Sequence, residues 1–170
     1  ETLARAETRR KEFYPDAIAT DDFQSLLRRD EIEVFDITPH PAEMARLVAR
    51  STADVQAHRI SVAAACSREH GVYVVLKGHR TVLATPSGDV ALNLTGNAGM
   101  ATAGAGDVLA GVIGAWLGQL SAPAEACRLG VYLHGLAGDL AARESGQPAL
   151  IASDIVAKLG AATLAVSGPV

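Results

Sequence analysis

Two short apolar runs separated by helical sequence limit what this chain can fold into. Residues 32–37 and 72–76 both read as buried strands. Between them, one helix is predicted from about residue 42 and a second from residues 51–54 to about residue 69. The continuous run Val72-Tyr-Val-Val-Leu76 is typical of a parallel strand covered on both faces. A strand, helices and a second strand form a crossover unit, which we expect to be right-handed. The sequence therefore predicts an α/β fold with a mainly parallel sheet covered by helices.

A hairpin and three further helices complete the predicted domain. Residues 81–84 and 90–92 read as two strands around a turn. A glycine-rich loop then enters one helix, Ser121 and Pro123 open another that runs to about Glu144, and Ser153 with Asp154 opens the last. The start of the chain is densely charged, which predicts a helix over residues 1–12 and a short helix capped by Thr20. We expect a charged helical segment over residues 1–30 and one domain over residues 31–170.

Composition argues against several classes of partner. The 170 residues carry a formal net charge of −4, so no broad basic surface indicates binding to nucleic acid or to an anionic membrane. No signal peptide and no bilayer-spanning apolar run is visible. Cys66 and Cys127 lie in apolar helical sequence and predict buried free thiols in a reducing compartment. The five histidines lack metal-site spacing. We expect a cytoplasmic protein whose ligands are small molecules.

Residues 93–111 combine a loop of small residues with the start of a helix. Such a loop lets the backbone approach a ligand closely, and a helix N-terminus presents free N–H groups to an anion. Asp107 lies at this junction. A carboxylate cannot serve as the counter-ion of a bound phosphate, because like charges repel. It is better suited as a base, or as a magnesium-linked group, that acts on a hydroxyl. The alternative is a tight turn in which Asp107 only caps the helix.

Three segments are expected to line one cleft, because ligands of open α/β sheets gather beyond the carboxyl ends of the strands. They are residues 38–43, 77–81 and 95–107. His40, held between two prolines, either donates a hydrogen bond to a ligand or lies in solvent. Lys77 either reaches a phosphate over the strand end or is an ordinary strand-terminal lysine.

Other polar residues near these segments have simpler interpretations. Arg80 can be a hairpin cation only, His79 a surface residue, and Glu43 a charge that favours a helix N-terminus. Two asparagines either bond a ligand or stabilise turns, namely Asn93 and Asn97. Three residues of one predicted helix are expected to pack or to support the site from behind, namely Tyr132, His134 and Asp139.

Several stretches, taken together and in order, resemble a known family. They are Thr38-Pro-His-Pro-Ala-Glu-Met-Ala-Arg-Leu47, Val75-Leu-Lys-Gly78 with Thr81, residues 93–111, Gly130-Val-Tyr-Leu-His-Gly-Leu-Ala-Gly-Asp139, and Ser153-Asp154. This set is similar to the ADP-dependent NAD(P)H-hydrate dehydratases, which are repair enzymes with a ribokinase-like fold. The similarity runs from about Ile32 to Leu164.

The resemblance implies a reaction and a set of site residues. The family uses ADP, or ATP in eukaryotic members, with magnesium to phosphorylate the ring hydroxyl of a hydrated nicotinamide cofactor. It then eliminates phosphate to regenerate NADH or NADPH, and AMP is released. Asp107 would be the base on that hydroxyl, and the hydrated dinucleotide would contact His40 and Asp107. The backbone that would hold the phosphoryl group belongs to Ala103, Gly104, Ala105 and Gly106, with Gly106 also touching the nucleotide. The segment that would line the ADP is Lys77, Gly78, His79, Arg80 and Thr81.

The chain departs from the family pattern in places. Ala42 stands where the family usually has Gly, and Ala98 where it usually has Pro. The family's domain has further strands and helices before the matching part, so residues 31–170 are expected to be the C-terminal part of a ribokinase-like domain. Two other functions stay open, a different ribokinase-like enzyme such as a small-alcohol kinase, and a non-catalytic nucleotide-binding module. We also expect a homo-oligomer.

Overall fold

The computed structural model describes residues 36–167 together with Thr8 and Lys11, which are both helical. Contacts divide the chain into two units, Glu1–Glu33 and Val34–Val170. The rest of the helix predicted over residues 1–12, the cap at Thr20 and residues 32–35 of the first predicted strand lie outside the described residues.

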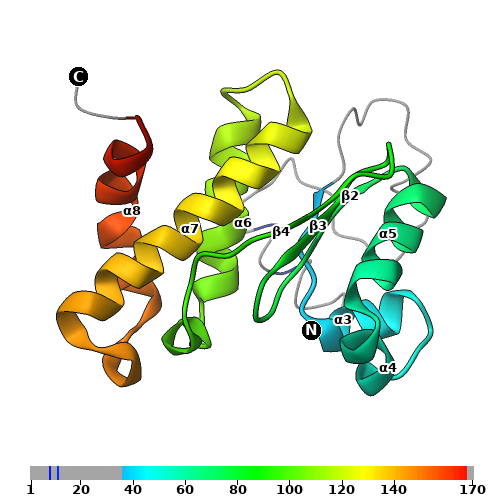
Figure 1. Ribbon diagram of the computed structural model, residues 1–170, viewed down its shortest axis with the longest axis horizontal. Helices are drawn as coiled ribbons and strands as arrows, with labels where there is room; N and C mark the ends of the chain where they lie inside the picture. The colour runs from blue at the N-terminus through cyan, green and yellow to red at the C-terminus, as the bar shows by residue number, and fades with distance from the viewer. Residues whose placement is uncertain (1–7, 9–10, 12–35, 168–170) are drawn as a thin grey trace. The chain divides into compact units, whose positions relative to one another are not determined.

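A four-stranded sheet in the order β1-β2-β3-β4 belongs to the second unit (Figure 1). β1 (Asp36–Ile37) pairs in parallel with β2 (Tyr73–Leu76), and Asp36 lies opposite Tyr73. β3 (Val82–Ala84) and β4 (Val90–Leu92) form the predicted hairpin, and β3 also runs antiparallel to β2. Among the described strands the sheet is therefore mixed rather than mainly parallel. Short turns can join neighbouring strands only in an antiparallel sense, and both connections after β2 are short.

Helices cover both faces of this sheet (Figure 1). α5 (Arg59–His70) packs on one face against β2 and β3. On the other face, Val75 and Leu83 share an apolar cluster with side chains of α6 (Ala105–Leu117) and α7 (Pro123–Ser145). The prediction that β2 is covered on both faces is confirmed, because Val74, Val75 and Leu76 are completely buried.

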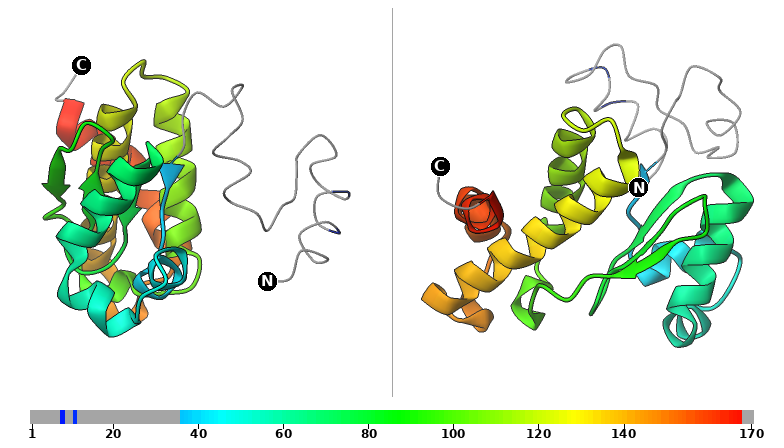
Figure 2. Two further views of the ribbon diagram at one scale, coloured as in Figure 1. Left: turned by 90° about the vertical axis from the view of Figure 1, so that its right-hand side faces the viewer. Right: turned by 45° about the horizontal axis from the view of Figure 1, so that its top comes forward.

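The three C-terminal helices form a second apolar cluster. α7 packs against both α6 and α8 (Ala152–Ser167), as the two views of Figure 2 show. Asp154 accepts a hydrogen bond from the Ile151 N–H at 3.0 Å, which confirms its predicted place at the start of the last helix. Among the helices that the structure describes, none is both long enough and apolar enough to cross a bilayer.

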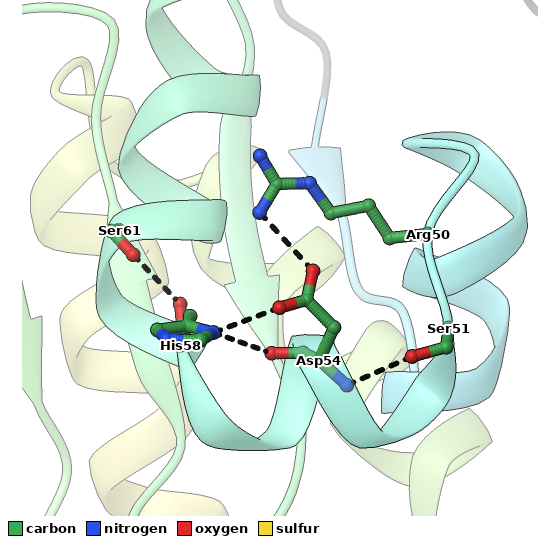
Figure 3. A network of polar contacts seen from close by, with 5 residues as sticks. All are labelled: Arg50, Ser51, Asp54, His58 and Ser61. Atoms are coloured by element: carbon green, nitrogen blue, oxygen red, sulfur yellow. Dashed lines mark hydrogen bonds and ion pairs between the residues drawn. The ribbon is translucent and has the colours of Figure 1, made fainter.

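The second predicted helix is broken at His58. The sequence predicts one helix to about residue 69, whereas the structure has α4 (Thr52–Ala57) and then α5, which follow the short α3 (Pro41–Leu47). Figure 3 shows the local cause. The Nδ1 of His58 turns back to Asp54 and lies 2.9 Å from its carboxylate, and Ser61 Oγ donates to the His58 carbonyl. These side-chain bonds compete with the regular helical pattern. The predicted helix start at residues 51–54 is confirmed, because α4 begins at Thr52 and Ser51 Oγ accepts the Asp54 N–H.

Both cysteines are buried thiols, as the sequence predicts. Cys66 lies in α5 and Cys127 in α7. Burial raises the pKa of the Cys66 thiol, and the nearby charge of Glu69 raises it further. The folded chain therefore disfavours the reactive thiolate of Cys66.

Candidate active site

A cavity of about 610 Å³ lies where the three expected segments meet. His40 comes from the start of α3, residues 77–81 from the loop after β2, and Thr102, Ala105 and Gly106 from the start of α6. The remaining lining residues belong to the loop after β4, to α6 and to α7, namely Asn93, Thr95, Gly96, Asn97, Ala98, Met100, Ala101, Leu109, Val131, His134 and Gly135. The shared cleft expected from the sequence is therefore present.

Lys77 connects three parts of this cavity. Its backbone N–H donates to the Pro39 carbonyl at 2.9 Å, which joins the loops that follow β1 and β2. Its Nζ lies 3.9 Å from Glu43 Oε2. A Cβ added to Gly106 would lie 2.9 Å from the same Nζ, so the ammonium lies directly against the start of α6. The positive end of a helix dipole and a lysine ammonium thus meet at one point, where a bound anion would be stabilised by both.

His40 caps α3. Its Nδ1 accepts the Ala42 N–H at 3.4 Å, and Glu43 Oε2 accepts the His40 N–H at 2.6 Å. A neutral imidazole in this arrangement has its hydrogen on Nε2, which remains a donor for a ligand. Glu43 supports the helix start, as predicted, and also faces Lys77.

The start of α6 offers free backbone donors. Gly104 precedes the helix with a φ of 83°, in the left-handed region that glycine adopts without strain. The Ala105 N–H donates to the Thr102 carbonyl at 3.3 Å, so this amide is already engaged. Within the described residues, the N–H groups of Ala103, Gly104 and Gly106 have no hydrogen-bond acceptor. Three of the four amides expected to bind a phosphoryl group are therefore free.

Asp107 lies in the first turn of α6 and is exposed. Its side chain makes no hydrogen bond or ion pair with any described residue, and it does not line the cavity, although the adjacent Gly106 does. The alternative reading of Asp107 as a helix cap is wrong, because Gly104 occupies the cap position and no side chain caps α6. The carboxylate is free to act on a ligand that extends past Gly106.

His134 supports the start of α6 from behind. It is buried in α7, and its Nε2 lies 2.9 Å from the Ala105 carbonyl oxygen. Burial lowers the pKa of His134, and the hydrogen bond to Ala105 offsets this only in part. A neutral ring donating through Nε2–H fits both observations, in agreement with the supporting role predicted from the sequence.

The loop after β4 is tied to α7 by side chains. Asp139 accepts hydrogen bonds from the Gly96 N–H at 2.8 Å and from Asn97 Nδ2 at 3.0 Å. Asn97 Oδ1 accepts the Gly99 N–H, and Asn93 Nδ2 donates to the Thr95 carbonyl, both at 3.0 Å. Both asparagines thus stabilise turns while also lining the cavity. Asp139 supports the site, as predicted.

The sequence prediction missed part of this wall. Val131 and Gly135 of α7 line the cavity, although they lie outside the segments that were expected to form it. The glycines of α7 carried a signal, because a Cβ on Gly135 would lie 2.2 Å from Thr95 Oγ1 and leave the loop no room. Tyr132 is 43% exposed, so its side chain packs only in part, while its carbonyl accepts a hydrogen bond from Thr95 Oγ1 at 2.9 Å.

The described residues contain no group of three or more His, Cys, Asp or Glu side chains placed to hold a metal ion.

Comparisons with known proteins show which family the chain resembles. The model of a family described as NAD(P)H-hydrate dehydratase matches residues 16–160. The chain is 52% identical over 120 residues to the bifunctional NAD(P)H-hydrate repair enzyme of Moorella thermoacetica, covering 71% of this chain and 23% of that protein. The chain thus spans about a quarter of the length of this relative.

Solved structures give the same result. The ADP/ATP-dependent NAD(P)H-hydrate dehydratase of Bacillus subtilis is 34% identical with a TM-score of 0.74, over 76% of this chain and 48% of that one. A ribokinase-like superfamily protein of Enterococcus faecalis is 32% identical with a TM-score of 0.63, over 73% of this chain and 42% of that one. The predicted ribokinase-like α/β class is confirmed. The chain belongs to the NAD(P)H-hydrate dehydratase family.

Proposed function

We propose that this chain acts in nicotinamide-nucleotide repair, in the ADP-dependent dehydration of hydrated NADH or NADPH with release of AMP and phosphate. One observation carries the proposal: Lys77 Nζ lies against Gly106, beside the free amides at the start of α6 and in the cavity that His40 lines. A cation and several N–H donors at one point suit a transferring phosphoryl group, because phosphoryl transfer needs charge neutralisation and positioning above all.

Asp107 is the proposed base. Its carboxylate takes the proton of the ring hydroxyl, the hydroxyl oxygen bonds to the β-phosphorus of ADP, and the bond from that phosphorus to AMP breaks. In the second step the carbon–oxygen bond of the phosphorylated ring breaks, a neighbouring ring carbon loses a proton, and phosphate leaves with NAD(P)H restored. The free N–H groups of Ala103, Gly104 and Gly106 would stabilise the phosphoryl oxygens, whereas Ala105 contributes less because its N–H is engaged.

We propose that ADP and the hydrated dinucleotide bind on different sides of the contact between Lys77 and Gly106. The loop of Lys77, Gly78, His79, Arg80 and Thr81 would hold ADP, since all five residues line the cavity and the loop directs its lysine to the start of α6. His40 would donate its Nε2–H to the hydrated dinucleotide. The cavity volume lies within the range of about 300–1,000 Å³ that is usual for small-molecule sites.

Magnesium is proposed to arrive with the nucleotide. The Bacillus subtilis relative was co-crystallised with ATP and Mg²⁺. In this chain the exposed Asp107 is the carboxylate nearest in sequence to the free amides, so it could approach an ion held by the phosphates. The ion would neutralise phosphate charge during transfer.

The direct test mixes the chain with hydrated NADH, ADP and magnesium. Return of NADH absorbance with matching consumption of ADP is the expected result. A phosphorylated product without NADH recovery would instead support a small-alcohol kinase. Tight ADP binding without any turnover would support a non-catalytic nucleotide-binding module.

Three expectations stay predictions. They are action in the cytoplasm, assembly as a homo-oligomer, and a division into a charged segment over residues 1–30 and the C-terminal part of the domain over residues 31–170. The mass of the native particle in solution tests the second of these.

A further inference from the structure

Arg59 has an unusual set of partners. It is the first residue of α5, and its Nη1 donates to the His79 carbonyl at 2.5 Å. Its Nη2 donates to the Leu76 carbonyl at 3.0 Å and to the Lys77 carbonyl at 3.3 Å. Among the described residues, no carboxylate pairs with this guanidinium. One side chain thus holds three carbonyl groups, one at the end of β2 and two in the loop that follows it.

The position of Arg59 makes a helix-stabilising role implausible. A cation in the first turn of a helix faces the positive end of the dipole, so the charge itself disfavours α5. The guanidinium is also partly buried, and its Nε is buried without a hydrogen-bond partner among the described residues. Burial of a charge must be offset by other interactions, and here the bonds to the loop supply them.

The loop held by Arg59 is one that needs support. Gly78 has a φ of 138° and Arg80 a φ of 56°, so two of its residues lie in the left-handed region, and one of them is not glycine. A residue other than glycine rarely adopts such a backbone conformation unless its surroundings impose it. A Cβ on Gly78 would also lie 3.0 Å from Arg59 Nη2, so the loop backbone packs directly on the guanidinium.

We propose that Arg59 is a positioning residue that fixes the loop of residues 76–80 in the shape that binds the nucleotide, and that it does not contact the nucleotide itself. The proposal rests on the ADP site proposed above. Holding the backbone on the α5 side keeps Lys77 aimed at the start of α6 before ligand arrives, which lowers the ordering cost of binding. Arginine suits this role better than lysine, because its planar fork presents several donors in fixed directions.

The test measures MgADP binding to the full 170-residue chain by titration calorimetry. For Arg59→Ala we expect the Kd to rise about tenfold or more, with the number of sites per chain unchanged. Arg59→Lys keeps the charge but loses the fork, so we expect a smaller rise of a few-fold. The matched control is Arg50→Ala, which removes an exposed arginine that pairs with Asp54 next to α4 (Figure 3) and should leave the Kd unchanged. Amide hydrogen exchange should quicken in residues 77–81 of Arg59→Ala.

The outcomes separate this proposal from the proposed function. A wild-type Kd in Arg59→Ala would overturn the positioning role and leave the ADP site intact. Fewer binding sites with an unchanged Kd would mean partial unfolding only, which also overturns it. Absence of MgADP binding by the wild-type chain would overturn the nucleotide site itself, and the role of Arg59 with it.

Discussion

Asp107 is the single residue on which the proposed chemistry depends. Replacing it with Asn keeps the shape but removes the base, so turnover should fall by a factor on the order of 10² to 10⁴. Affinity for MgADP should stay nearly unchanged, because the free N–H groups at the start of α6 remain. Steady-state rates measure the expected loss of turnover, and titration calorimetry measures the affinity for MgADP. A variant that turns over at the wild-type rate would show that Asp107 is not the base.

Gly106 tests the contact between Lys77 and α6. In Gly106→Ala the new methyl group would lie 2.9 Å from the present position of Lys77 Nζ, so the ammonium must move. We expect MgADP affinity to fall several-fold, while alanine's helix propensity stabilises α6 by up to about 1 kcal/mol. The control is Gly111→Ala in the same helix, where nothing lies within 4 Å of the added carbon. Unchanged affinity in Gly106→Ala would contradict the proposed place of the phosphate.

Single residues also show what a sequence can reveal. His40 and Lys77 were predictable as site candidates, because prolines, a glycine and a buried strand mark their surroundings. Arg59 was not, since its partners are carbonyls 17 to 20 positions along the chain and carbonyls carry no sequence signal. Its place at a helix start was not predictable either, because the sequence predicts one helix from residues 51–54 to about residue 69 with Arg59 inside it.

Between elements, the start of α6 depends on α7 through His134. The pKa of this buried histidine is lowered in the folded chain, so the unfolded chain binds the proton more readily. Stability linked to His134 is therefore fully present above about pH 6.5, the ordinary histidine pKa, and is lost as the pH falls below it. Urea unfolding between pH 7.5 and pH 5 should show this loss.

The variant that isolates this effect is His134→Gln. Glutamine keeps an N–H donor for the Ala105 carbonyl but does not titrate in this range, so the dependence on pH below 6.5 should become shallower. An equally steep dependence in the variant would assign the acid sensitivity to other groups.

Local sequence signals predict some helix ends but not others. The start of α7 at Pro123 was predictable, because proline is favoured in the first turn of a helix. The break at His58 was not, since it arises from side-chain bonds among Asp54, His58 and Ser61 that compete with a pattern otherwise suited to one helix. The mixed sheet could be foreseen only in part. The hairpin was clear, but its pairing with β2 depends on the whole sheet.

At the scale of the whole molecule, the fold brings distant segments to one point. Parallel pairing places the loops after β1 and β2 at the same edge of the sheet, and the bond from the Lys77 N–H to Pro39 fixes them there. α7 then holds the loop after β4 and the start of α6 through Asp139 and His134. The sequence shows that these segments belong together, but the close approach of the loop after β4 to α7 depends on Gly135 and Gly138, where an added Cβ would clash with Thr95 and Met100.

A ligand that binds only the folded chain must raise its stability, which gives a test on the whole molecule. MgADP at 100 times its Kd should add about 2.7 kcal/mol. For a chain of this size, each kcal/mol added to the free energy of unfolding raises Tm by roughly 2–4 °C, so Tm should rise by about 5–10 °C. In Lys77→Ala most of this shift should disappear at the same concentration, because the cation that meets the phosphates is gone. Lys158→Ala is the matched control, since that lysine is 27% exposed against 26% for Lys77 and pairs with Glu144 on the distant α8 side. An equal shift in both variants would place the nucleotide elsewhere on the chain.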